Sequence, residues 1–132
     1  MGGLRHQHSS TIFGLYEYLP TNTKELKKNE CYAAGFAFAV RTADTVELIK
    51  WYVLCALEKD CMAPPGAKLK CSFGKDKHGT YANCHRYDQS VINILLANMH
   101  NHNPKGYVVK TSAIRFQRRA AKKLSESDLK CD

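Results

Sequence analysis

Large and small apolar residues alternate along residues 32–40 of the sequence. Phe36, Phe38 and Val40 fall on one face of an extended chain, because successive side chains of a strand point to opposite sides. The opposite face carries alanines, so the pattern predicts a strand that is buried on both faces. Gly35 indicates a bulge, or a place where a ligand or a neighbouring chain approaches the backbone.

Two later stretches have helical spacing. Apolar side chains recur at three- and four-residue steps over residues 43–58, after Thr42 as a suitable N-cap. The second predicted helix covers residues 88–99, where Asp88 would cap the helix and interact favourably with the positive end of its dipole. A strand followed directly by a buried helix is typical of α/β folds, so we expect both helices to pack on a sheet. The side chains that this packing would bury include Trp51 and Leu95.

The helical and strand-like periodicity stops between residues 60 and 86, where three of the six cysteines lie. Their spacing matches no zinc-binding pattern. An even number of cysteines at such spacing is typical of secreted proteins, so we expect a disulfide-stapled loop. The alternative is six reduced, buried thiols in a cytosolic protein. We favour the pairs Cys61–Cys71 within the loop and Cys55–Cys84 between the helices. The other two cysteines are Cys31 and Cys131.

Positive charge is concentrated near the C-terminus. The net charge is +8, and residues 105–132 hold 8 lysines and arginines against 3 acidic residues. Such a segment could bind nucleic acid, acidic glycans or a membrane surface, or form the solvated face of a helix. No apolar run reaches the roughly 20 residues of a membrane-spanning helix, and residues 1–10 lack the apolar block of a signal peptide. A disulfide-bonded chain without its own signal suggests that a segment N-terminal to it is missing.

Polar side chains crowd the start of the second predicted helix, in the run Asn-Cys-His-Arg-Tyr-Asp-Gln-Ser over residues 83–90. Helix N-termini present unpaired N–H groups and positive potential, which suit anionic ligands. His85, Arg86 and Asp88 could there bind a phosphate or a sugar hydroxyl, or move a proton. Two alternatives remain. Asp88 could serve only as a helix cap, or Cys84 could act as a nucleophile with His85 as its base, although adjacent residues rarely reach each other in that way.

Three separated motifs carry a resemblance to known proteins: Trp-Tyr-Val-Leu-Cys-Ala-Leu at 51–57, Cys-Met-Ala-Pro-Pro at 61–65, and Asn-Cys-His-Arg-Tyr-Asp-Gln-Ser-Val-Ile-Asn-Ile-Leu-Leu at 83–96. Together with residues 14–21, they resemble an animal family of glycosyltransferase-like proteins, much of it catalogued as domains of unknown function. The resemblance covers residues 11–115, with the motifs in the same order at compatible spacing. Members of this family look like type II Golgi proteins with a short cytoplasmic tail, one membrane anchor and a lumenal domain of the GT-A type.

The resemblance implies an α/β fold, specifically a partial GT-A-like mixed sheet with flanking helices. Residues 11–115 would form the C-terminal part of the glycosyltransferase-like domain. Residues 1–10 would be a disordered N-terminus, and residues 116–132 a basic tail or a terminal helix.

The resemblance also implies site residues. In GT-A enzymes a small-residue strand lines the donor-sugar pocket, and an Asp-Gln pair at the start of a later helix lies near the reacting sugar. Asp88 is therefore the expected catalytic residue, with Gly35, His85, Arg86 and Gln89 binding substrate. The family's metal-binding Asp-x-Asp motif and nucleotide-binding half have no counterpart here, so we expect this chain to hold no cofactor and to be inactive by itself. A full-length parent would bind Mn²⁺ or Mg²⁺, a nucleotide sugar and a glycan acceptor in the lumen of the Golgi or another secretory compartment.

The alternative function is a non-enzymatic module in which residues 105–130 bind nucleic acid or an acidic glycan through their positive charge. Tyr107 and Phe116 are the only aromatic residues in this segment. It therefore lacks the row of aromatic side chains on which single-stranded nucleic acid stacks, and nucleic acid is the less favoured ligand.

Overall fold

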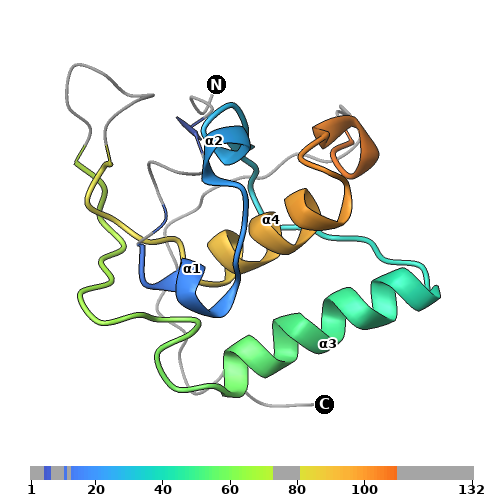
Figure 1. Ribbon diagram of the computed structural model, residues 1–132, viewed down its shortest axis with the longest axis horizontal. Coiled ribbons are helices and arrows are strands. Elements are labelled where there is room, and N and C mark those ends of the chain that lie inside the picture. Colours follow the sequence, from blue (N-terminus) through green and yellow to red (C-terminus); the bar gives the residue numbers. More distant parts are fainter. Residues whose placement is uncertain (1–4, 7–10, 12, 73–80, 110–132) are drawn as a thin grey trace, which may run out of the picture.

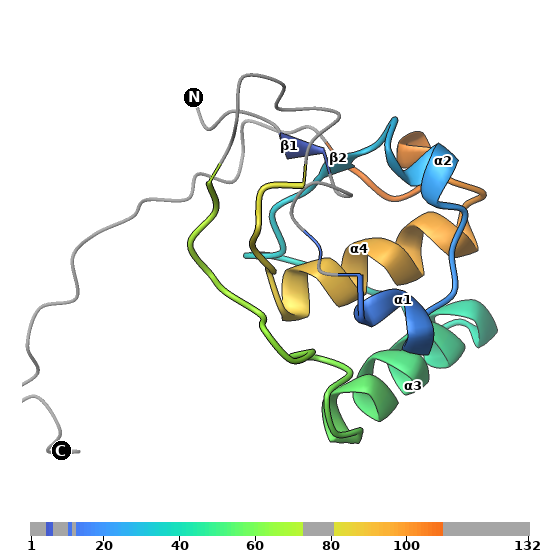
Figure 2. The ribbon, with the colours of Figure 1, turned by 60° about the vertical axis from the view of Figure 1, so that its left-hand side comes forward.

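The computed structural model describes residues 5–6, 11, 13–72 and 81–109 of the chain. In Figures 1 and 2, α4 lies at the centre, with α3 along one side and the short helices α1 and α2 on others. The predicted helices are confirmed, the first of them ending at residue 57. The elements in chain order are β1 (Arg5–His6), α1 (Leu15–Tyr18), α2 (Thr23–Leu26), β2 (Glu30–Cys31), α3 (Ala43–Leu57), α4 (Asp88–Met99) and the 3₁₀-helix η2 (Pro104–Gly106).

Two of the predicted segments fall largely outside this description. Of residues 1–10, only Arg5–His6 belong to the described part, and residues 116–132 lie wholly outside it. Cys131 lies outside it as well. The predicted disorder at the N-terminus and the predicted basic tail or helix at the C-terminus therefore stay predictions.

One face of α4 forms the middle of the core. Val91, Ile94 and Ala97 lie on it and are fully covered. They recur at three-residue steps, so they share one side of the helix. The buried residues that complete this cluster come from α1, α2, the end of α3 and the turn after it: Leu15, Leu19, Leu26, Cys55 and Cys61.

α3 turns only a narrow face toward α4. Leu48 and Cys55 are its buried residues, whereas Trp51 is 47% exposed. The prediction that Trp51 lies in the core is therefore wrong, and Leu95 of α4 is only partly buried. The reason is geometric, because at 3.6 residues per turn Trp51 falls to one side of the line through Leu48 and Cys55, and Tyr52 falls to the other.

Both ends of α3 are fixed by local contacts. Thr42 Oγ1 accepts a hydrogen bond from the Thr45 backbone N–H at 3.3 Å, and Thr45 Oγ1 accepts one from the Thr42 N–H at 2.9 Å. This reciprocal capping box confirms Thr42 as the N-cap. At the other end the chain leaves the helix at Glu58 and turns through Asp60, whose φ of 66° lies in the left-handed region.

The expected mixed sheet is not supported. β1 and β2 pair antiparallel, with Arg5 opposite Cys31 and His6 opposite Glu30, and this short pairing is the whole β structure of the described residues. Residues 32–40 form neither strand nor helix, and Phe38 is 80% exposed. The prediction of a strand buried on both faces is therefore wrong. In Figure 1 this segment is a stretched connection between β2 and α3.

Asn93 provides the physical reason for this difference. Its buried side-chain amide accepts a hydrogen bond from the Tyr32 N–H at 3.0 Å and donates one to the Tyr32 carbonyl at 2.9 Å. Asn93 Nδ2 also donates to the Gln89 carbonyl at 2.8 Å. A side chain of α4 thus takes the place that a neighbouring strand would have beside Tyr32. Beyond Tyr32, the alternating residues 33–40 have no described strand beside them with which to form a sheet.

The four loop and helix cysteines are in disulfides, as expected, but the expected pairing is wrong. The bonds are Cys55–Cys61, with 5.2 Å between the Cα atoms, and Cys71–Cys84, with 4.7 Å. Cys61 follows directly on the turn that ends α3, which returns it to Cys55. Cys71 is brought to Cys84 by two flanking backbone hydrogen bonds, Ser72 N–H to the Ala82 carbonyl at 2.8 Å and His85 N–H to the Lys68 carbonyl at 2.7 Å.

We predict that Asn93→Asp lowers the free energy of unfolding by about 2–3 kcal/mol, because a carboxylate cannot donate to the Tyr32 and Gln89 carbonyls and would face them with negative charge. The matched control is Asn98→Asp in the same helix. Asn98 is exposed, and an aspartate there would still accept from Thr21 Oγ1 and would lose only the exposed bond to the Pro20 carbonyl, so the loss should stay within about 0.5 kcal/mol. Urea unfolding measures both variants, and equal losses would contradict the role given to Asn93.

We also predict that the double variant Cys71→Ser with Cys84→Ser lowers the free energy of unfolding by about 3 kcal/mol. A disulfide that closes a loop of about 15 residues restricts the unfolded chain by that amount. Cys31→Ser is the control, because Cys31 belongs to neither disulfide. Peptide mapping under non-reducing conditions checks the pairing itself, and a Cys61–Cys71 peptide would contradict it.

Candidate functional site

His85, one of the predicted substrate-binding residues, faces the interior. Its side chain is fully buried, and its Nε2 lies 3.0 Å from the Met62 carbonyl, to which it must be the donor. The ring packs edge-on to that of Tyr87, with 5.2 Å between the centroids. Burial lowers the pKa of His85, although the hydrogen bond to Met62 acts in the opposite direction. His85 is therefore a neutral structural link between the start of α4 and the loop that follows α3.

The start of α4 differs from the predicted cap. Tyr87 is the N-cap residue, with a φ of 46° and no capping hydrogen bond from its side chain, so the prediction of Asp88 as N-cap is wrong. Ser90, in the first turn, ties the helix to the residues before it, because its Oγ accepts from the Arg86 N–H at 3.2 Å and from Thr11 Oγ1 at 3.1 Å. Asp88 is the first residue of the helix and still lies in the turn where negative charge is favourable.

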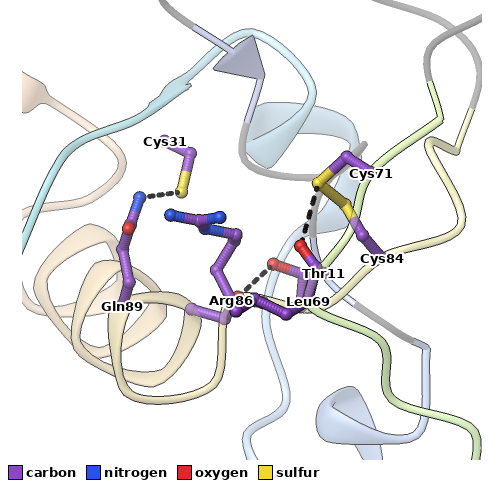
Figure 3. The surroundings of a disulfide bond; sticks show 8 residues. Thr11, Cys31, Leu69, Cys71, Cys84, Arg86 and Gln89 are labelled. Carbon is purple, nitrogen blue, oxygen red and sulfur yellow. Dashed lines mark hydrogen bonds between the residues drawn. A yellow bond between two sulfur atoms is a disulfide. The ribbon is translucent and has the colours of Figure 1, made fainter. Parts of the chain in front are cut away.

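The remaining predicted residues point in different directions. Asp88 is exposed, and its charge adds to burial in raising the pKa of Tyr52 on α3. Gln89 turns toward β2, where its Nε2 donates to Cys31 Sγ at 3.1 Å. Figure 3 shows the Arg86 side chain extending toward the same place. Arg86 and Gln89 therefore share one side of the helix start, and Asp88 faces α3.

Gly35 is exposed in the connection between β2 and α3. Within the described residues, no hydrogen bond or ion pair joins it to the other four predicted site residues. The expected cleft shared by Gly35 with His85, Arg86, Asp88 and Gln89 is not formed by these contacts. The catalytic and substrate-binding roles of the five residues stay predictions.

Two adjoining hollows lie elsewhere, the first between α1, α3 and α4, and the second between α2, the segment before it and the end of α4. The first has a volume of about 320 Å³ and is mainly apolar, and the second has a volume of about 670 Å³ and is more polar. They share Pro20 and Asn98 in their walls. The first is lined by Tyr18, Leu19, Pro20, Glu47, Leu48, Trp51, Leu95, Asn98 and Met99, and the second by Pro20, Thr21, Asn22, Glu25, Asn98, Asn101 and His102.

Sequence reasoning missed these hollows, because their walls come from segments far apart in the chain. Two features of the sequence could have indicated the hollows. Trp51 is the only tryptophan of the sequence and lies four residues after Glu47, which places both on one side of a helix. Asparagines also gather at the end of the second helix and just after it, at positions 98, 101 and 103.

The described residues contain no group of three or more histidine, cysteine, aspartate or glutamate side chains that could hold a metal ion. We therefore assign no metal to them. None of the described helices has both the length and the apolar character that crossing a membrane requires.

We predict that His85 makes the stability of the protein depend on pH. Because the pKa of His85 is lowered in the folded state, its contribution is complete above about pH 6.5 and falls as the pH drops from there toward the lowered value. His85→Asn should remove this part of the dependence. Urea unfolding of both proteins between about pH 5 and 8 measures the difference. A wild-type advantage that grows on acidification would contradict the burial of a neutral imidazole.

No protein-family model matches the chain, and neither a curated protein nor a solved structure matches it. The resemblance to glycosyltransferase-like proteins therefore depends on the motifs at 51–57, 61–65 and 83–96. These motifs correspond to the second half of α3, the turn that carries the first disulfide and the start of α4.

Proposed function

We propose that this chain is the C-terminal portion of a glycosyltransferase-like protein of the secretory pathway, and that it is inactive by itself. In the complete protein it would help to transfer a sugar from a nucleotide sugar to a glycan or protein acceptor. Two disulfides suit an oxidising lumen. The observation that carries the proposal is an apolar surface on α3 and on residues 36–40, which a larger domain would cover.

The outer face of α3, formed by Val46, Val53 and Leu57, is opposite the face that packs on α4. These three side chains are 50%, 47% and 79% exposed, and Lys50 is the charged residue among them. Ile49 and Leu54 beside them are also exposed. α3 therefore has apolar residues on the face turned away from α4 as well as on the face that packs against it, which is typical of a helix that a larger domain covers on more than one side.

Residues 36–40 extend the same argument. Phe36, Phe38 and Val40 are exposed, and their alternation fits a strand in the middle of a sheet. The Val40 carbonyl accepts a hydrogen bond from Thr45 Oγ1, while the backbone of residues 36–39 has no hydrogen-bond partner in the described structure. This segment could therefore pair with a strand from the nucleotide-binding half of a glycosyltransferase-like parent.

The roles proposed around α4 follow from exposure. The Asp88 carboxylate is accessible at the start of the helix, so it could accept a proton from a sugar hydroxyl or hydrogen-bond to it. Arg86 and Gln89 lie on the neighbouring side, where a guanidinium could stabilise phosphate charge. Because His85 is buried against Met62, we give it a supporting role behind this site rather than contact with substrate.

The proposal predicts that a longer protein containing this segment, secreted from animal cells, transfers sugar from one member of a panel of nucleotide sugars. Asp88→Asn should lower kcat at least about 100-fold with an unchanged melting temperature, as expected when a general base is lost. The control is Asp44→Asn, another exposed acid in the first turn of a helix, which should keep full activity.

Absence of transfer with every nucleotide sugar would contradict the proposal, as would equal activity of Asp88→Asn and Asp44→Asn. The alternative, a basic module that binds acidic glycan or nucleic acid, predicts tight binding of heparin or DNA by the present chain. Such binding would weaken steeply with salt, because it depends on release of counterions.

A further inference from the structure

The apolar hollow between α1, α3 and α4 presents two half-exposed aromatic rings. Trp51 is 47% exposed and Tyr18 is 38% exposed, and both line the hollow. The indole is held in place, because its Nε1 donates to Glu47 Oε1 at 2.8 Å. Lys50 Nζ lies 5.8 Å from the centroid of the indole ring. A fixed aromatic ring beside an apolar hollow suits a flat ligand with C–H groups on one face.

The wall between the two hollows is built from fixed hydrogen bonds. Thr21 Oγ1 donates to Asn98 Oδ1 at 2.6 Å, and Asn98 Nδ2 donates to the Pro20 carbonyl at 3.0 Å. These bonds tie the segment between α1 and α2 to α4. The apolar and the polar hollow therefore keep one relative position and form a single, continuous surface.

The polar hollow contains groups that can still bond to a ligand. Asn22 Oδ1 accepts the backbone N–H groups of Lys24 and Glu25, so the Asn22 amide keeps its N–H donors. Glu25 Oε1 pairs with Lys28 at 2.8 Å, and its second oxygen is left as an acceptor. Donors and acceptors are therefore mixed within a few side chains, as in a site for hydroxyl groups.

The charge of the walls does not favour an anionic ligand. Glu47 and Glu25 are the carboxylates that line the hollows, and each pairs with a lysine outside the lining, Lys50 at 3.3 Å and Lys28 at 2.8 Å. Because both lysines are already paired, phosphate, sulfate and uronic acid groups would find no unpaired lysine or arginine in these walls. An apolar side chain of a peptide would fill the first hollow and leave the second one unused.

We propose that these two hollows form a binding site for a neutral glycan of at least two sugar units. One unit stacks on Trp51 in the apolar hollow, and the next directs its hydroxyl groups to Asn22 and Glu25. The site belongs to the chain itself and needs neither a nucleotide sugar nor Asp88, so it goes beyond the proposed transfer function.

The sequence contains a single tryptophan, so its fluorescence reports on this site alone. We expect the 132-residue chain to show a saturable fluorescence change with the neutral disaccharides N,N′-diacetylchitobiose or lactose, independent of salt. Trp51→Ala, followed by NMR titration, should weaken binding at least roughly tenfold, which corresponds to loss of one stacking contact. Trp51→Phe should restore part of it, because a ring remains.

Val53→Ala is the matched control, because Val53 lies on the outer face of α3 and has the same exposed fraction as Trp51, 47%. It should bind the disaccharides as the wild type does. Three results would overturn the proposal: no saturable change with either neutral disaccharide, preference for a sulfated disaccharide with steep salt dependence, or equal weakening by Val53→Ala and Trp51→Ala. Stronger binding of cyclohexanol than of the disaccharides would do the same, since it would show an apolar pocket only.

The outcome is separable from that of the transfer assay. Disaccharide binding without any sugar transfer by the longer protein supports the glycan site and overturns the enzyme. Transfer that depends on Asp88, without disaccharide binding at Trp51, does the reverse.

Discussion

The arrangement of the chain around α4 depends on the pairing of Asn93 with the backbone of Tyr32. Within a sheet, a neighbouring strand would receive the N–H of Tyr32 and donate to its carbonyl. Here one buried amide does both, at 3.0 and 2.9 Å. Tyr32, directly after β2, is consequently hydrogen-bonded to α4, and the chain beyond it runs to α3 without pairing with a described strand. The core is therefore a set of helices around α4, and the residues whose alternation predicted a buried strand lie at the surface.

Helical periodicity identified the two long helices, because a helix is a local structure and its apolar stripe repeats along the sequence. Thr42 was also identified, since a capping box requires only two residues that are three positions apart. The strand at 32–40 could not be judged in the same way. Alternation predicts that both faces of a segment are covered, but it does not show which strands cover them, because those strands lie elsewhere in a chain. Here the side chain of Asn93 takes the place of a neighbouring strand at Tyr32, the first residue of the segment.

For the cysteines, too, the sequence predicted the local feature but not the one that depends on distant residues. Their even number and spacing indicated disulfides, whereas the pairing of Cys71 with Cys84 depends on backbone hydrogen bonds at Ser72 and His85 that no spacing reveals. The residues at the start of α4 were predicted to act together in a site, and the structure shows their side chains pointing in different directions. Their directions were not predictable, because they follow from a left-handed φ of 46° at Tyr87. The hollow beside Trp51 was hidden for a further reason, since α1, α3 and α4 meet only in the folded chain.

The exposed apolar residues on the outer face of α3 affect the abundance of the protein in a cell. Chaperones and proteases of the cell act on proteins that keep apolar segments exposed. Val46, Val53 and Leu57 would present such a segment continuously as long as nothing covers them. The abundance of this chain would then be set by the supply of whatever covers α3, and much less by its own folding stability.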